Sequence, residues 1–102
     1  MNYLKFSHEY SKLKDRVFTT IRRGMPKFDP GELVECKTPT QTFNAIILYA
    51  ICMETDQLPT DLLIYDTDQP TREEAMKLFQ SFYRTPIEEN NVWTLYLLKK
   101  EA

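Results

Sequence analysis

The sequence predicts a single α+β domain in which about five strands form a curled, mixed β-sheet with three short helices beside it. Runs rich in β-branched and aromatic residues recur between turn signals made of Pro, Gly or Asn, as expected for strands. The helical patterns are grouped between strands and do not follow each strand in turn, which disfavours a doubly wound parallel sheet. With 42% hydrophobic and 27% charged residues, the 102-residue chain suffices for one core, so residues 1–102 are expected to form one domain.

The first half of the chain alternates strand patterns with loops. Strands are predicted over residues 3–6, 17–22, 33–37 and 43–53, and a final one over 92–98. Ser7 can cap a short helix over residues 8–14. Both glycines and two of the prolines fall within residues 24–31, which predicts a loop there. The long apolar run 43–53 is expected to form the centre of the core.

Two further helices are predicted between the fourth and fifth strands. One covers residues 58–65, with Pro59 in its first turn. The other begins at Thr71, because Thr71 and Glu74 have the spacing of a capping box. Its apolar residues follow three- and four-residue spacing and are expected to pack on the sheet, namely Ala75, Leu78, Phe79 and Phe82. Truncation of Phe82 to Ala is therefore expected to cost about 3–5 kcal/mol of stability.

The net charge of −2 hides an asymmetry between two segments. Residues 1–28 carry seven Lys or Arg against two acids, a net +5, whereas residues 54–91 carry nine acids against three bases, a net −6. A basic patch formed by the first segment can hold a phosphate backbone even on an acidic protein, because binding responds to the local potential. The alternative is that the two segments pair with each other in the fold.

Several functional classes are disfavoured by what the sequence contains. Cys36 and Cys52 lack CxxC spacing and lie in apolar runs, so both are expected to be buried thiols. The only histidine, His8, has no partner at metal-site spacing, so no metal or cofactor is expected. The N-terminus does not have the pattern of a signal peptide, and no apolar run reaches the length of a membrane span. We therefore expect a cytoplasmic protein without a membrane partner.

The segment from Val17 to Arg23 is the most informative for function. A β-branched and aromatic run that ends in Arg22 and Arg23 delivers two guanidinium groups to the end of a strand, which suggests an anionic ligand. Strand alternation places four side chains on one face: Arg16, Phe18, Thr20 and Arg22. An ordinary solvated strand end is the competing interpretation.

Three short motifs together give a family resemblance. They are Thr20-Ile21-Arg22, then Pro30-Gly31-Glu32, and the aromatic helix end 78–83 leading into 93–96. Their order along the chain resembles the ASCH domain of the PUA-like superfamily, although Glu32 stands where that family more often has Asp. The resemblance implies a small β-barrel-like domain, or pseudo-barrel, with a cleft between barrel and helices that binds RNA or a nucleotide.

The resemblance also implies site residues. Thr20 and Arg22 fall on the family's Thr-x-Arg positions, and Tyr83 falls on an aromatic position near the cleft helix, where it can stack on a base or serve as a core residue. Arg23 and Lys27 are added on chemistry alone, as cations that can bind phosphate. Arg16 is added because alternation along the strand places its charge near Thr20. The leading prediction is thus an RNA- or nucleotide-binding domain with a basic cleft and no catalysis of its own.

Two alternatives stay open. Some ASCH-like proteins are amidohydrolases that act on acylated cytidine through a Lys-x-x-Thr pair and a carboxylate, for which Thr20 and Asp68, or Glu73, would be the candidates here. Val17 occupies the lysine position of that pattern, and Arg16 cannot replace a base because its guanidinium stays protonated. We therefore expect no hydrolysis of acylated cytidine. The second alternative is a protein-interaction module whose partner docks on the basic segment.

Overall fold

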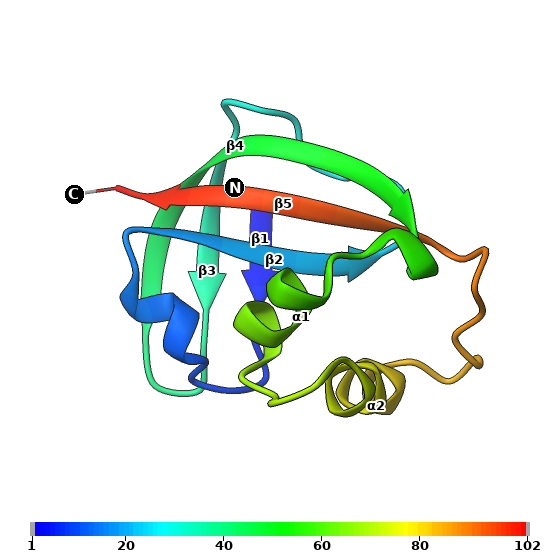
Figure 1. The fold of residues 1–102 in the computed structure, drawn as a ribbon. Coiled ribbons are helices and arrows are strands. Elements are labelled where there is room, and N and C mark those ends of the chain that lie inside the picture. Colours follow the sequence, from blue (N-terminus) through cyan, green and yellow to red (C-terminus); the bar gives the residue numbers. More distant parts are fainter. Residues whose placement is uncertain (1, 102) are drawn as a thin grey trace.

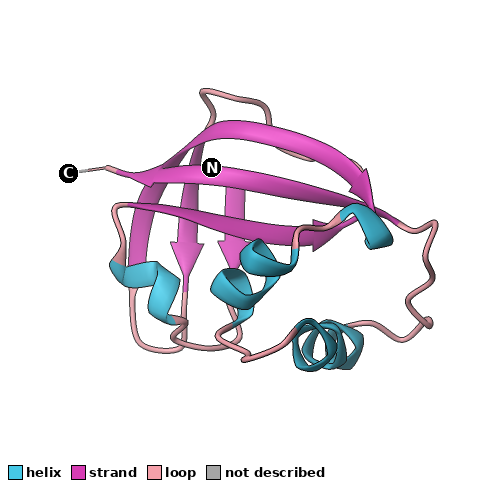
Figure 2. Ribbon diagram, in the orientation of Figure 1, coloured by secondary structure: helices cyan, strands magenta, loops and turns pink. Residues whose placement is uncertain are grey.

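The structure, a computed structural model that describes residues 2–101, is a curled five-stranded sheet with its helices gathered on one side (Figures 1 and 2). The strands are β1 (Asn2–Lys5), β2 (Val17–Arg23), β3 (Leu33–Lys37), β4 (Thr42–Glu54) and β5 (Val92–Lys100). The helices are α1 (Thr60–Thr67), α2 (Arg72–Phe82) and the two short 3-10 helices η1 (Ser11–Lys14) and η2 (Thr55–Gln57). None of the helices within residues 2–101 is long and apolar enough to cross a membrane.

The sheet is mixed and open on one side. Its strand order is β1-β3-β4-β5-β2, with β1 parallel to β3 and the other neighbours antiparallel. The sheet curls into a half-barrel, so that the edge strands β1 and β2 face each other across the open side (Figure 1). This confirms the predicted α+β class with a curled mixed sheet of five strands.

Two clusters of buried apolar side chains pack against the two faces of the sheet. The larger cluster fills the concave side and includes Phe18 of β2 and Tyr96 of β5. The smaller one packs α1 and α2 against the other face, around the fully buried Trp93. Strand β2 contributes to both clusters from its two faces, because Phe18 belongs to the first cluster and Ile21, on the opposite face, to the second. The face of β2 that carries Thr20 and Arg22 is therefore the concave one.

The burial of β4 differs from the prediction. Ala45 and Ile47 are fully buried, as expected, but Tyr49 and Ile51 are exposed, so only half of the apolar run forms the core. The reason is a β-bulge: the pairing with β5 shifts register between Ile47 and Tyr49, which reverses the side-chain alternation beyond that point. Exposure also extends to Cys52, contrary to the prediction of two buried thiols.

The helices are confirmed only in part. The predicted helix over residues 8–14 is reduced to the 3-10 helix η1, which Tyr10 precedes in extended conformation, so Ser7 caps nothing there. Only residues 15 and 16 separate η1 from β2, and short 3-10 helices are frequent in such connections. The predicted capping box of α2 is confirmed in its N-cap half, because the Thr71 hydroxyl accepts a hydrogen bond of 3.1 Å from the backbone N–H of Glu74.

The prediction that Phe82 packs on the sheet was wrong. Phe79 is 5% exposed and stacks on Trp93 with ring centroids 5.2 Å apart, but Phe82 is 45% exposed. Phe82 is the last residue of α2, and the chain turns away into an extended conformation at Tyr83. The last turn of the helix therefore projects beyond the face that Ala75 and Phe79 bury.

Candidate functional site

A pocket of about 330 Å³ lies at the open side of the half-barrel, between the N-terminal segment, β2, α1 and the end of α2. Its lining comprises Lys5, Phe6, Ser7, Tyr10 and Lys12 from the N-terminal segment, Thr20, Ile21 and Arg22 from β2, Asp66 and Thr67 from α1, and Phe79, Phe82 and Tyr83 from the region of α2. This volume is of the size of a small-molecule site.

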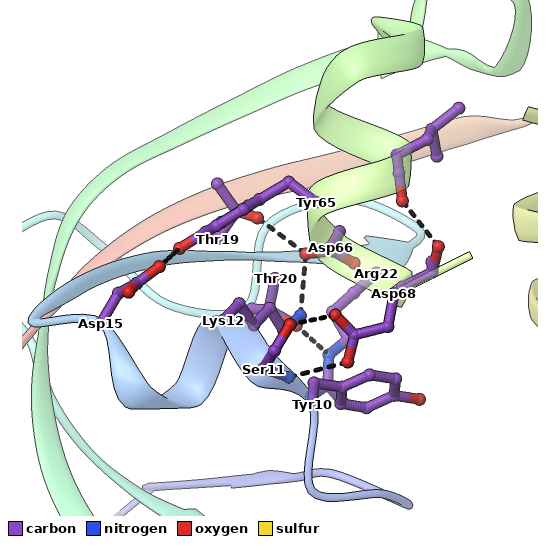
Figure 3. A network of polar contacts seen from close by, with 12 residues as sticks. Tyr10, Ser11, Lys12, Asp15, Thr19, Thr20, Arg22, Tyr65, Asp66 and Asp68 are labelled. Carbon is purple, nitrogen blue, oxygen red and sulfur yellow. Dashed lines mark hydrogen bonds and ion pairs between the residues drawn. The ribbon is translucent and has the colours of Figure 1, made fainter. Parts of the chain in front are cut away.

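A buried ion pair forms one end of the polar floor. The Lys12 ammonium donates to a carboxylate oxygen of Asp66 at 2.8 Å, and the two side chains are only 2% and 4% exposed. The same oxygen accepts a bond of 2.8 Å from the Thr19 hydroxyl. In Figure 3, Asp66 reaches down from α1 toward Lys12 on η1 and Thr19 on β2. The pair joins the basic segment of residues 1–28 to the acidic segment of residues 54–91, so part of the charge asymmetry between them is neutralised within the fold.

The surroundings of Lys12 act on its ammonium in opposite directions. Burial lowers the pKa of Lys12, and the nearby Asp66 carboxylate raises it. The ammonium also lies near the rings of Phe6 and Tyr10, 5.3 and 5.1 Å from their centroids. Burial raises the pKa of the Tyr10 hydroxyl above its ordinary value.

Arg22 spans the open side of the sheet. Its Nε donates to the Thr20 hydroxyl at 2.9 Å, and one terminal nitrogen donates to the backbone carbonyl of Lys5 at the end of β1, also at 2.9 Å. The guanidinium carbon lies 5.0 Å from the centroid of the Phe6 ring. Arg22 thus connects the two edge strands by a side chain at the place where the backbone ladder is missing.

Aromatic rings form the walls of the pocket. Phe6 and Tyr10 come from the N-terminal segment, and Phe79, Phe82 and Tyr83 from α2 and the residue after it. The Tyr83 ring is held edge-on against Trp93, which fixes its position. Phe82, by contrast, is 45% exposed and also lines the pocket.

The structure brings together three of the six side chains predicted to bind an anion. Thr20, Arg22 and Tyr83 line the pocket, whereas Arg16 and Lys27 are exposed outside it. Arg16 lies one residue before the start of β2.

Arg23 lies on the other face of β2 and holds a loop. Its guanidinium donates to the backbone and hydroxyl oxygens of Thr85, to the carbonyl of Pro86 and to the side chain of Asn91. Its backbone N–H donates to the Tyr83 hydroxyl at 3.2 Å. These bonds make Arg23 an anchor of the segment between α2 and β5 and leave it outside the pocket.

The carboxylate of the pocket is not the predicted one. Asp68 terminates α1 in a left-handed conformation, with φ of 61°, and accepts a hydrogen bond of 2.7 Å from the backbone N–H of Ser11. Its side chain ties α1 to η1 outside the lining, and Glu73 is exposed in the first turn of α2. The carboxylate in the pocket belongs to Asp66.

Sequence reasoning missed Lys12 and Asp66, the most buried charges of the site. The burial of Asp66 could have been predicted from helical spacing, because Asp66 lies three residues after the apolar Leu63. Leu63, Asp66 and Thr67 share one buried face of α1. For Lys12 the sequence offers no comparable signal, because a lysine beside one leucine is usually solvated.

Within residues 2–101 no group of three or more His, Cys, Asp or Glu side chains is arranged to hold a metal ion. The pocket instead offers hydrogen-bond donors from Lys12, Arg22 and Thr20, an acceptor in Asp66, and aromatic faces. Such a site can bind a planar polar molecule by stacking and by edge-on hydrogen bonds.

Comparison of the sequence with models of protein families gives no match, and no curated protein and no solved structure is significantly similar. The resemblance to the ASCH domain stays a prediction based on the short motifs of the sequence.

Proposed function

We propose that this protein binds a nucleotide, either free or as an unstacked nucleotide of a single-stranded RNA, with the base in the pocket at the open side of the half-barrel. The family resemblance favours the same class of ligand. The protein-interaction alternative gains no support from the pocket, because its polar groups are recessed.

The observation that carries the proposal is the pairing of aromatic walls with a mixed polar floor. Bases that are splayed out of a strand are bound by stacking on aromatic side chains and by hydrogen bonds to their edges. Phe82 supplies an exposed ring at the pocket, and Lys12 and Asp66 place a donor and an acceptor at its floor. A base edge needs both kinds of group.

The test is calorimetric titration of the protein with the four ribonucleosides, the four 5′-monophosphates and a short single-stranded RNA. Because base–aromatic stacking contributes about 1–3 kcal/mol, Phe82→Ala is expected to weaken the binding by about fivefold to a hundredfold. Tyr49→Ala is the matched control, since Tyr49 is 62% exposed on β4 but does not line the pocket. Absence of binding to every probe, or equal losses in the two variants, would contradict the proposal.

The amidohydrolase alternative is a second candidate because of one observation. A lysine was expected to be missing near Thr20, since Val17 occupies the family position, but Lys12 lines the same pocket as Thr20. Burial lowers the pKa of Lys12, which favours a neutral amine able to act as a base, whereas Asp66 opposes this. The close ion pair makes binding without chemistry the leading proposal.

Incubation of the purified protein with N4-acetylcytidine, followed by chromatography, separates the two candidates. We expect no cytidine to form. Turnover that is lost in both Lys12→Met and Thr20→Ala, and is retained in the exposed control Lys27→Met, would make hydrolysis the leading function.

A further inference from the structure

The charges that line the pocket do not balance. Two cations of the lining, Lys12 and Arg22, stand against a single carboxylate, Asp66. Lys5 also lines the pocket, but it is exposed, and its contact there is the backbone carbonyl that accepts from Arg22. That carboxylate is already bound to Lys12 and Thr19. The nearby Asp68 is bonded to Ser11 outside the lining. The pocket therefore has an excess of positive charge that no side chain in it neutralises.

Arg22 carries the part of this excess that is held in a fixed position. Among residues 2–101 no carboxylate forms an ion pair with its guanidinium, and both of its acceptors, the Thr20 hydroxyl and the Lys5 carbonyl, are neutral. These two bonds use two of the five N–H groups of a guanidinium, so three are left. The Phe6 ring beneath the group and the bond to β1 fix its plane.

A partly buried guanidinium without an anion is energetically unsatisfied. Burial removes water from the charged group, and neutral acceptors restore less than a carboxylate or a phosphate does. The planar fork of N–H groups matches the oxygens of such an anion in two parallel bonds.

On this basis we infer that the pocket binds its ligand through an anionic group seated on Arg22, so that a nucleoside monophosphate is bound in preference to the nucleoside. This inference rests on the proposed function and specifies its ligand. In this arrangement the phosphate is bound by Arg22, and the base stacks on the aromatic side chains of the pocket walls.

The test compares each 5′-monophosphate with its nucleoside by calorimetry. A charge-assisted bond of this kind corresponds to a preference of about tenfold to a hundredfold for the monophosphate. That preference is expected to shrink when the NaCl concentration rises from about 50 to 500 mM, whereas nucleoside affinity changes little. The measurement at increasing NaCl concentration uses the native protein, so its result does not depend on whether a variant folds.

Substitutions of the cations identify which side chain binds the anionic group of the ligand. Arg22→Met should abolish the preference, and Arg22→Lys should retain part of it, because a lysine keeps the charge and loses the fork. Lys27→Met is the matched control, an exposed cation outside the pocket, and should leave the preference unchanged. Loss of the preference in Lys5→Met but not in Arg22→Met would overturn the assignment to Arg22.

The outcomes separate this inference from the proposed function. Equal, salt-independent affinity for nucleosides and monophosphates would refute the anion site and leave nucleotide binding intact. If inorganic phosphate binds as tightly as the monophosphates and is lost in Arg22→Met, the anion site stands and the nucleotide proposal fails. If no probe binds, both fail.

Discussion

The buried pair of Lys12 and Asp66 gives the sharpest prediction for stability. The side chains are 2% and 4% exposed and 2.8 Å apart, so removal of one partner leaves the other charge in a site with little water. Loss of one partner of a buried pair typically costs about 3–5 kcal/mol. We expect about 3 kcal/mol for Lys12→Met, at the low end, because Thr19 still donates to Asp66.

The double variant Lys12→Met/Asp66→Leu is expected to cost far less than the sum of the single variants. Replacement of a buried pair by apolar side chains is often close to neutral, and the main loss is the partner of the Thr19 hydroxyl, about 1–2 kcal/mol. Urea unfolding measures the three variants, with the fluorescence of the single, fully buried Trp93 as the signal. Single costs below about 1 kcal/mol, or additive costs in the double variant, would refute the reasoning.

The pH dependence of Asp66→Asn provides an independent check. Burial lowers the pKa of Lys12 and Asp66 opposes this, so removal of the carboxylate lowers the pKa of Lys12 in the folded state further. The unfolded state then binds more protons than the folded state, so stability rises with pH. The difference in unfolding free energy between Asp66→Asn and the native protein should narrow as the pH rises from about 7 to 9. A difference that widens would contradict the assigned environment.

Three further predictions concern packing, the thiols and acid stability. Phe79→Ala should cost about 3–5 kcal/mol in urea unfolding and Phe82→Ala less than about 1.5 kcal/mol, because only the first ring is buried against the sheet; the reverse order would contradict this packing. Burial raises the pKa of Cys36 to about 11, so iodoacetamide at pH 8 should alkylate only the exposed Cys52 in the folded protein and both thiols in urea. Hydrogen bonds from two threonine side chains lower the pKa of Glu9 from 4.5 to about 2, so its contribution to stability is present above pH 4.5 and is lost as the pH falls toward 2. Thermal unfolding of Glu9→Gln should lack that part of the acid sensitivity, and an unchanged acid profile would show that Glu9 contributes nothing to it.

The sequence predicted the strands well and the helices less well. The run Leu33–Lys37 was placed with correct bounds, and the cap at Thr71 was correct, because both depend on local chemistry. The burial of β4 was not predictable in the same way, since the bulge before Tyr49 reverses its alternation and depends on pairing with β5. The exposure of Phe82 depends on where the neighbouring loop leaves the helix.

The sequence predicted the placement of site residues only where the alternation of a single strand determines it. Thr20 and Arg22 share a face by alternation and both line the pocket, as does Ile21 between them. Arg23, the next residue, had to point the other way, although which partner it meets there depends on a loop far along the chain. The Lys12–Asp66 pair joins residues 54 positions apart, and no local pattern specifies such a contact.

The link from Arg22 to Lys5 has a consequence for local opening of the fold. β1 is hydrogen-bonded along its length only to β3, and on its other side a side chain takes the place of a neighbouring strand. An edge held in this way opens more readily than a strand paired on both sides, so its backbone amides should exchange early with deuterated solvent. A ligand that immobilises the guanidinium makes this opening more costly. Occupancy of the pocket should then slow exchange in β1, including residues 2–4, which do not line it.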